Sequence, residues 1–269
     1  VFVVPGRYNK LMSKGKIMEI KAFKGLRYNK EVVGNVGVCI SPPYDVIDED
    51  LQNQLYDASP YNIEKVIRPK ESDMDEADGN KYGKANSFFV DWIAKNALVN
   101  DQAEMIYAYV QDFEIAAGKF QRSGFVALAK LEQFGHGVQP HEKTLDGPKA
   151  DRLNLTRATK AQFGQIFMLY DDPEKVADKI IAESAAHPAL LDHVDMDGVR
   201  HRLYAIDEPA KIEVVQKMMV SKQTVIADGH HRYETALNYY NETKNPLAAY
   251  GMMAFVNMRN QGLVILPTH

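Results

Sequence analysis

Two β-rich runs near the middle of the chain limit the possible folds more than any other sequence pattern. The runs cover 105–113 and 120–131, and the segment between them includes Gly118. Two such runs around a short glycine-containing segment predict a β-hairpin. Helical and strand-like stretches alternate on both sides of it. We therefore expect an α+β (mixed α/β) fold.

The remaining elements follow from apolar spacing and from capping residues. Asp48 is expected to cap a helix that runs to about Ala58. The segment 75–97 is predicted to be a helix with an apolar stripe of Tyr82, Ala85, Phe89, Trp92 and Ile93. Further helices are expected over about 149–161, from Pro173 to about His187, over 209–220 and over about 230–242. Strands are expected over 32–40, 164–170, 203–206 and 224–227, and a second hairpin is expected to join 251–258 to 263–266.

The composition is that of an ordinary globular protein, with 45% hydrophobic and 25% charged residues in a chain of 269. Disordered, collagen-like and coiled-coil classes are therefore excluded. The net charge is −4, whereas a dedicated nucleic-acid binder carries a basic surplus, so nucleic acid is not expected as the main partner. Cys39 is the only cysteine. It excludes internal disulfides and multi-cysteine metal sites, and it fits a cytoplasmic location.

The two ends of the sequence predict where the folded unit begins and stops. No apolar run approaches the ~20 residues that cross a bilayer, so no membrane segment is expected. Met18 could be a start, so 1–17 are interpreted as an extension and 18–269 as a single α+β domain. The strand-like stretch 263–266 is followed by only three residues. We therefore expect the chain to be truncated at its C-terminus.

The densest group of polar residues lies between Asp228 and Arg232, after an apolar strand and before a helical pattern. Gly229 lets the backbone turn sharply and approach a ligand. A helix N-terminus attracts anions, and the planar guanidinium of Arg232 suits phosphate oxygens. His230 and His231 would be disfavoured as cations there unless an anion or metal lay beside them. The pattern predicts a strand, a tight turn and a helix over 223–240, with a phosphate site at the helix start.

Two other interpretations of this segment stay open. Asp228 could be no more than the N-cap of the helix, with the following residues on a solvated face. A cap, however, explains only one of the five residues. A metal site would use Asp228 with His230, but the charge of Arg232 would repel a cation. Phosphate binding is therefore preferred.

A second polar group follows Pro140. His141 and Glu142 form a possible acid/base pair. Cations that could hold phosphate surround them, namely Lys143, Lys149, Arg152 and Arg157. The alternative is a surface loop followed by a helix with Asp–Arg ion pairs.

A third motif comprises Pro42, Pro43, Tyr44 and Asp45. Its two prolines force a stiff, extended turn. Taken alone, a sequence of this kind is often only a rigid turn.

Six motifs in order carry a resemblance to a known family. They are SPPYDVI at 41–47, SPYN at 59–62, HEKT at 141–144 with Asp151 and Arg152, IFMLY at 166–170, IADGHHRYETA at 226–236 and LVILPTH at 263–269. Together they resemble the bacterial and archaeal domain-of-unknown-function 1015 family, often labelled ParB-like, over about 18–269. Members of that family generally continue past the last motif, which agrees with a truncated chain.

Within that family, the 228–232 segment resembles the phosphate-binding motif of a wider superfamily. The superfamily includes the ParB nucleotide-binding domain, sulfiredoxin and an archaeal free-serine kinase that uses ADP. The resemblance implies a ParB/sulfiredoxin-like nucleotide-binding core around the strand–turn–helix. It also implies that Asp228, Gly229, His230, His231 and Arg232 bind phosphate, with Asp228 as a ligand of Mg²⁺.

The chain departs from two of these relatives. Sulfiredoxin has a catalytic cysteine inside its motif, where this chain has histidine, so sulfinic-acid reduction is not expected. ParB proteins add a basic helix-turn-helix, and no such segment can be identified in this acidic chain. Chromosome partitioning is therefore not expected.

These observations lead to a nucleotide-dependent small-molecule kinase as the expected function. It would transfer a phosphoryl group from ATP or ADP, with Mg²⁺, to a hydroxyl such as that of free L-serine. The alternative is a ParB-like nucleotide-binding switch or binding module without turnover, and a DNA-associated role is a weaker possibility.

Phosphoryl transfer needs cations around the moving charge and a base at the acceptor hydroxyl. Glu142 is the preferred base and Asp45 the alternative, with His141 and His230 as further catalytic candidates. Lys143 and Arg152 are expected to add to the phosphate site. Since neither polar group alone offers both functions, we expect residues 141–143 and Arg152 to lie on the same cleft as 228–232.

Overall fold

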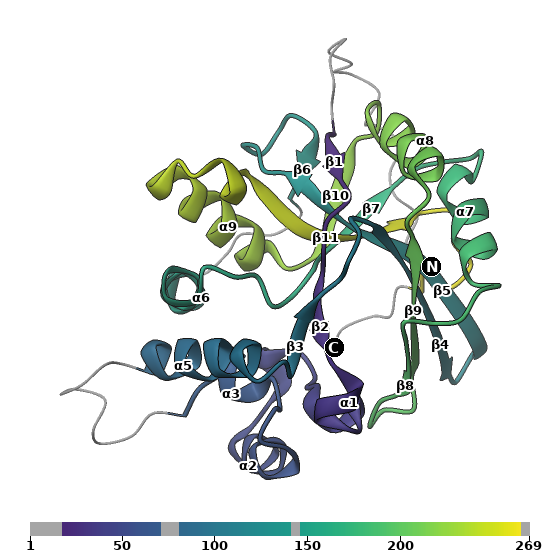
Figure 1. Ribbon diagram of the computed structural model, residues 1–269. Coiled ribbons are helices and arrows are strands. Elements are labelled where there is room, and N and C mark those ends of the chain that lie inside the picture. The colour runs from purple at the N-terminus through teal and green to yellow at the C-terminus, as the bar shows by residue number, and fades with distance from the viewer. Residues whose placement is uncertain (1–17, 71–80, 141–145, 265–269) are drawn as a thin grey trace.

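The computed structural model describes residues 18–70, 81–140 and 146–264 (Figure 1). Within them, most strands form one twisted sheet in the order β6-β10-β7-β11-β5-β4-β9-β8, with β1 also paired to β5. Parallel and antiparallel pairs are mixed in this sheet, and helices lie around it (Figure 1). The predicted mixed α/β fold is confirmed.

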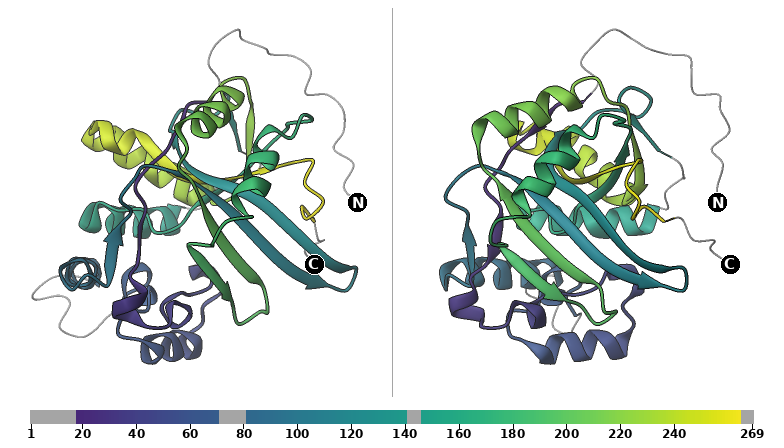
Figure 2. Two further views of the ribbon diagram at one scale, coloured as in Figure 1. Left: turned by 45° about the vertical axis from the view of Figure 1, so that its right-hand side comes forward. Right: turned by 90° about the vertical axis from the view of Figure 1, so that its right-hand side faces the viewer.

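The predicted central hairpin is confirmed and forms the middle of the sheet. Strands β4 (Ile106–Ile115) and β5 (Gly118–Lys130) pair antiparallel, and Gly118 makes the turn with φ +125°. The C-terminal half of β5 pairs with β11 (Tyr250–Asn257) on one side and with β1 (Ile20–Lys21) on the other. The hairpin is long enough to project beyond the helices (Figure 2).

The strands beyond the hairpin complete the sheet on either side. Next to β4 lie β9 (Arg200–Ile206) and then β8 (Leu191–Val194), both antiparallel to their neighbours. Next to β11 lies β7 (Ile166–Tyr170), followed by β10 (Thr224–Asp228) and β6 (Val138–Gln139). The register of β10 against β7 shifts between Ile226 and Asp228. This irregularity stands immediately before the predicted turn.

The two faces of the sheet have different surroundings. Successive side chains of a strand point to opposite faces, and on β4 Ala108 and Val110 belong to the main hydrophobic core. That core also contains residues of α7 (Val176–Ser184) and α8 (Pro209–Met219). The alternate residues Tyr109 and Gln111 lie on the other face, opposite Leu203 and His201 of β9. The second face is therefore available to line a cavity.

A second hydrophobic cluster includes Trp92, which is 1% exposed, and draws mainly on the helices below the sheet in Figure 1. Residues of β2 (Leu26–Tyr28), β3 (Leu98–Asn100), α1 (Lys30–Val33), α3 (Glu64–Ile67) and α5 (Lys81–Ala94) contribute to it. Leu155 of α6 (Asp146–Thr159) joins the same cluster. The cluster therefore ties α1, α3 and α5 to α6, while α2 (Glu49–Ala58) packs against α3.

Helices α6 and α9 (His230–Thr243) pack against each other, and two ion pairs connect them. Lys149 Nζ lies 3.1 Å from Glu234, and Arg157 Nη2 lies 2.6 Å from Glu242. The second ion pair lies eight residues after the first in both helices, from Lys149 to Arg157 in α6 and from Glu234 to Glu242 in α9. The two helices therefore run in the same direction.

Several predicted elements are confirmed with small changes at their ends. Asp48 caps α2 by accepting from the Leu51 N–H at 2.8 Å. Helix α8 and the pair β10–α9 lie where the sequence placed them. Helix α5 is described from Lys81 onward, since 71–80 lie outside the described residues. Ile93, on its predicted apolar stripe, is exposed.

The predicted strand over 32–40 is wrong. The segment holds the end of α1 and the 3₁₀ helix η1 (Val36–Cys39). Asn29 and Asn35 accept hydrogen bonds from the N–H groups of Glu31 and Gly37, and Gly34 with φ +70° separates the two turns. These caps outweigh the β preference of the valines.

Two further boundaries differ from the prediction. Helix α7 begins at Val176 rather than Pro173, because the Asp172 carboxylate accepts the Val176 N–H at 2.8 Å. In the second predicted hairpin, the first strand is β11. The described part of the second strand, 263–264, is irregular, and 265–266 lie outside the described residues. Among the described helices, none is both long and apolar enough to cross a membrane.

Candidate functional site

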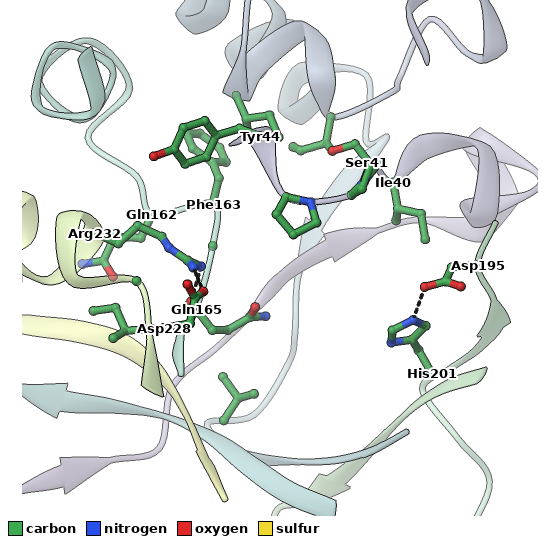
Figure 3. Close-up of a pocket in the computed structure, with 18 of the residues that line it drawn as sticks. Ile40, Ser41, Tyr44, Gln162, Phe163, Gln165, Asp195, His201, Asp228 and Arg232 are labelled. Carbon is green, nitrogen blue, oxygen red and sulfur yellow. Dashed lines mark hydrogen bonds and ion pairs between the residues drawn. The ribbon is translucent and has the colours of Figure 1, made fainter. Parts of the chain in front are cut away.

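A cavity of about 1220 Å³ lies between the second face of the sheet and the layer formed by residues 35–67 (Figure 3). Its lining comes from distant parts of the sequence: the Pro42–Tyr44 turn, strands β4 and β9, α6, the segment 161–166 and the start of α9. Two of the three polar motifs, 42–44 and 228–232, therefore meet at one cavity, together with Arg152 of the remaining one.

The turn at one side of this cavity has the predicted strand–turn–helix form. Strand β10 ends at Asp228, Gly229 has φ +93°, and α9 begins at His230. An L side chain is strained at this φ, so glycine is required. Gly229 stands at the N-cap of α9, and Asp228 pairs with Arg232 instead of capping the helix. The interpretation of Asp228 as a simple N-cap is therefore wrong.

The Arg232 side chain folds back over the turn. Its guanidinium pairs with Asp228 and donates to the Gln165 carbonyl oxygen. Two glycines leave room for it, because a Cβ at Gly229 would lie 2.9 Å from Arg232 Nε and one at Gly164 would lie 3.2 Å from Nη1. The side chains of Arg232 and Asp228 are 30% and 66% exposed, so the pair is open to solvent at the cavity wall.

The two histidines of the turn differ in their surroundings. His230 is 1% exposed, whereas His231 is half-buried. Both line the cavity. One turn further along α9, Thr235 lines it as well. Its buried hydroxyl has no hydrogen-bond partner within the described part of the chain.

Arg152 of α6 lines the same cavity as the turn. Its Nε donates to the Asp151 carboxylate at 2.9 Å, and its guanidinium lies 4.6 Å from the centre of the Tyr44 ring. Burial raises the pKa of Asp151, but the charge of Arg152 and the Tyr82 hydroxyl, 2.8 Å away, lower it below its usual value. An ionised Asp151 thus holds Arg152 beside the double-proline turn.

The other predicted site residues fall into two groups. Lys149 and Arg157 pair with glutamates of α9, whereas the Asp–Arg pair expected within the helix is Asp151–Arg152. His141, Glu142 and Lys143 lie outside the described residues, as does the side chain of Asp45. Their convergence with 228–232 therefore stays a prediction.

A hydrogen-bonded group that the sequence did not reveal lines another side of the cavity. Tyr109 Oη lies 2.5 Å from His201 Nδ1. His201 Nε2 lies 2.8 Å from Asp195 Oδ2 (Figure 3). Asp195, in the turn after β8, also accepts from the N–H groups of Asp197 and Val199 at 3.0 and 2.9 Å. We call Tyr109, His201 and Asp195 the relay group.

Burial and charge act on the relay group in opposite directions. Burial raises the pKa of Tyr109 to about 12, against the lowering effect of the Arg122 charge. Burial also raises the pKa of Asp195, but hydrogen bonds from His201 and the Val199 N–H outweigh it, and the net pKa is lowered. Asp195 is therefore an ionised acceptor, and Tyr109 is a neutral phenol.

The described residues offer few ligands for a metal. Among them there is no group of three or more histidine, cysteine, aspartate or glutamate side chains placed to hold an ion. Asp228 contributes one carboxylate at the turn. Mg²⁺ commonly uses one or two carboxylates together with substrate phosphates. A Mg²⁺ ion at this turn would therefore need its other ligands from a phosphate-bearing molecule, and it would compete with Arg232 for Asp228.

Comparison with known proteins identifies the chain at the level of a family. A family model described as "Protein of unknown function (DUF1015)" matches residues 20–269. The searches of curated proteins and of solved structures gave no match.

Proposed function

The chain belongs to the DUF1015 family, and we propose that it is a nucleotide-dependent small-molecule kinase. It would transfer a phosphoryl group from ATP or ADP to a hydroxyl such as that of free L-serine. The observation that carries this proposal is the meeting of Arg232, the start of α9 and Arg152 at one cavity. A polyphosphate needs several positive groups in one place, and a helix N-terminus with arginines supplies them.

The chemistry of the turn supports a phosphate rather than an apolar ligand. The Arg232 side chain lies against Gly164 and Gly229 and donates to the Gln165 carbonyl oxygen, so its guanidinium is already positioned before a ligand binds. Its present partner, Asp228, is exposed and can exchange for a phosphate oxygen. The likeness of 228–232 to the phosphate-binding motif of ParB, sulfiredoxin and the free-serine kinase points to the same ligand, and to a ParB-like core.

The cavity can also accommodate the rest of a nucleotide. Its volume of about 1220 Å³ exceeds the roughly 300–1,000 Å³ of typical ligand pockets. The buried hydroxyls of Ser41 and Thr235 line it and lack hydrogen-bond partners within the described part of the chain. A buried polar atom without a partner is costly, and a ligand can satisfy it.

Mg²⁺ would be held by Asp228 and the nucleotide phosphates. When bound, it would neutralise charge on the phosphoryl group being transferred. The chain would supply the remaining positive charge through Arg232 and Arg152. We place the reaction in the cytoplasm, since the sequence carries a single, buried cysteine.

The test is a panel of nucleotides and free amino acids, with and without Mg²⁺, scored for phosphorylated product by ³¹P NMR. We expect product from ATP or ADP with a hydroxyl amino acid such as serine. Nucleotide binding by calorimetry without product from any acceptor would instead favour the binding module without turnover. Absence of nucleotide binding would contradict both.

A further inference from the structure

We infer that the relay group, Tyr109, His201 and Asp195, takes the proton from the acceptor hydroxyl. This inference rests on the proposed function and assigns the base of that reaction. It places the acceptor, a small hydroxyl-bearing molecule, across the cavity from the Asp228–Arg232 turn. Figure 3 shows His201 and Asp195 on one side of the cavity and Asp228 with Arg232 on the other.

The hydrogen bonds of the relay group define the direction of proton movement. The ionised carboxylate of Asp195 only accepts, so His201 Nε2 carries a proton and donates it over 2.8 Å. In a neutral imidazole, Nδ1 is then the acceptor. The Tyr109 hydroxyl, 2.5 Å away, donates to it. The remaining lone pair of the phenol oxygen can accept a proton from a ligand.

The environment of Tyr109 favours this role over that of a packing residue. Its neighbours Ala108 and Val110 are buried, whereas Tyr109 is half-buried and lines the cavity. The ring also stacks on His201, with centroids 5.9 Å apart and planes at 14°. The stacking fixes the phenol against its proton acceptor.

The half-buried positive charge of Arg122 lies near the relay group. Arg122 donates from Nε and Nη2 to Gln111 Oε1 at 2.9 and 2.8 Å, and Gln111 Nε2 lies 3.4 Å from His201 Nδ1. Burial lowers the pKa of Arg122. Its charge stabilises negative charge that develops on Tyr109 during proton transfer.

A purely structural role for the relay group would duplicate interactions that already hold the β8–β9 hairpin together. The β8–β9 hairpin is already held by backbone pairing over Leu191–Val194 and by the Arg200–Asp192 ion pair, with Nη2 to Oδ2 at 2.7 Å. Holding the hairpin does not require a tyrosine and a histidine at the cavity wall.

The proposed step conserves atoms and charge. The acceptor O–H bond breaks and its proton passes to the Tyr109 oxygen, while the Tyr109 proton passes to His201 Nδ1. The acceptor oxygen forms a bond to the transferred phosphorus, and the bond from phosphorus to the leaving phosphate oxygen breaks. The resulting imidazolium is stabilised by Asp195 and returns its proton to solvent after product release.

Tyr109→Phe tests the inference, because it removes one hydroxyl and keeps the ring. A general base contributes about 10²- to 10⁴-fold, so turnover should fall by about that factor. Nucleotide affinity, measured by calorimetry, should stay within about twofold, since the turn is untouched. Asp195→Asn should lower kcat by about 10- to 100-fold with little change in KM for the nucleotide, because it acts through His201.

Tyr107→Phe is the matched control. Tyr107 is two residues away on β4, and its hydroxyl also makes a side-chain hydrogen bond, here to Asp101 Oδ2 at 2.7 Å, but it contacts Gly25 and does not line the cavity. This variant should lose stability and keep turnover. Glu142→Gln and Asp45→Asn are measured alongside, as the carboxylates named by the sequence.

Each outcome distinguishes this inference from the proposed function. Turnover in Tyr109→Phe equal to wild type, or a fall matched by Tyr107→Phe, overturns the relay and leaves the kinase proposal standing. The same conclusion follows if Glu142→Gln or Asp45→Asn abolishes turnover while Tyr109→Phe does not. If the wild type itself forms no product with any acceptor, both proposals are overturned.

Discussion

The two sides of the cavity hold their polar groups in opposite ways. On the turn side, Arg232 and Asp228 form an ion pair between 30% and 66% exposed side chains. On the relay side, His201 and Asp195 are 20% and 24% exposed, and backbone N–H groups and the Tyr109 hydroxyl fix them further. The turn side is the more exposed of the two and its carboxylate can exchange, whereas the relay side is less exposed and is held by more hydrogen bonds.

This contrast suits two different tasks. An exposed ion pair contributes little to stability, typically about 0–1 kcal/mol, so exchanging Asp228 for a phosphate costs little. Groups held by several hydrogen bonds keep their geometry during a reaction and need little reorganisation. We therefore expect changes on the turn side to act on nucleotide binding, and changes on the relay side to act on turnover.

The largest effect on the turn side should come from Arg232→Ala. A hydrogen bond to a charged group contributes about 1.5–3 kcal/mol, so the nucleotide Kd should rise about 10- to 100-fold in calorimetry. Arg259→Ala is the control, because Arg259 also pairs with an exposed carboxylate, Asp171, but neither residue lines the cavity or belongs to α6 or α9. An equal loss of affinity in both variants would contradict the division between the two sides.

Gly229→Ala should affect both stability and nucleotide binding. An L residue at φ +93° costs about 1–2 kcal/mol, and the new Cβ would displace Arg232. Gly135→Ala isolates the backbone cost, because Gly135 has φ +98° and no atom within 4 Å of an added Cβ. Urea unfolding should show losses in both variants, and only Gly229→Ala should weaken nucleotide binding. If Gly229→Ala bound nucleotide with the affinity of the wild type, the position of Arg232 would not matter for nucleotide binding.

Ionic strength should have a smaller effect, and it should change ligand binding at the turn side more than at the relay side. Raising the ionic strength from about 0.01 to 0.15 M shortens the Debye length from about 30 to 8 Å. Nucleotide affinity should therefore fall severalfold over this range, because the turn is exposed. The KM for a neutral hydroxyl acceptor at the relay side should change less. Parallel titrations of both ligands measure this, and equal salt slopes would remove the distinction.

The smallest effect concerns the pH dependence of stability. The pKa of Asp195 in the folded protein lies below its usual value of 3.8, so its ionised form stabilises the fold. This contribution is present at neutral pH and is lost as the pH falls through the lowered pKa. The difference in unfolding free energy between wild type and Asp195→Asn should therefore shrink from pH 7 to about pH 3. Asp197→Asn, an exposed change in the same turn, should show no such trend.

The turn could be predicted from the sequence because its residues are consecutive. Asp228, Gly229 and Arg232 lie within five positions, and glycine at a strand–helix junction has a local physical meaning. The central hairpin and the caps of α2 are local in the same sense. Local patterns failed at 32–40, where asparagine caps competed with valine preferences.

The relay group could not be predicted in this way. Tyr109 and His201 are 92 positions apart, and they meet only through the register that places Gln111 opposite His201. The sequence shows Tyr107, Tyr109 and Gln111 on one face of a strand, which is a weak signal. The partner strand and its register depend on the whole sheet, which no local pattern specifies.

The parallel pairing of α6 with α9 makes the two arginines at the cavity thermodynamically dependent on each other. Lys149–Glu234 and Arg157–Glu242 fasten the helices at both ends, Arg152 lies between these points on α6, and Arg232 lies in the first turn of α9. A phosphate held by one arginine would thereby also restrain the helix that carries the other. The free energies contributed by Arg152 and Arg232 should accordingly be non-additive, as for residues that share one cooperative unit.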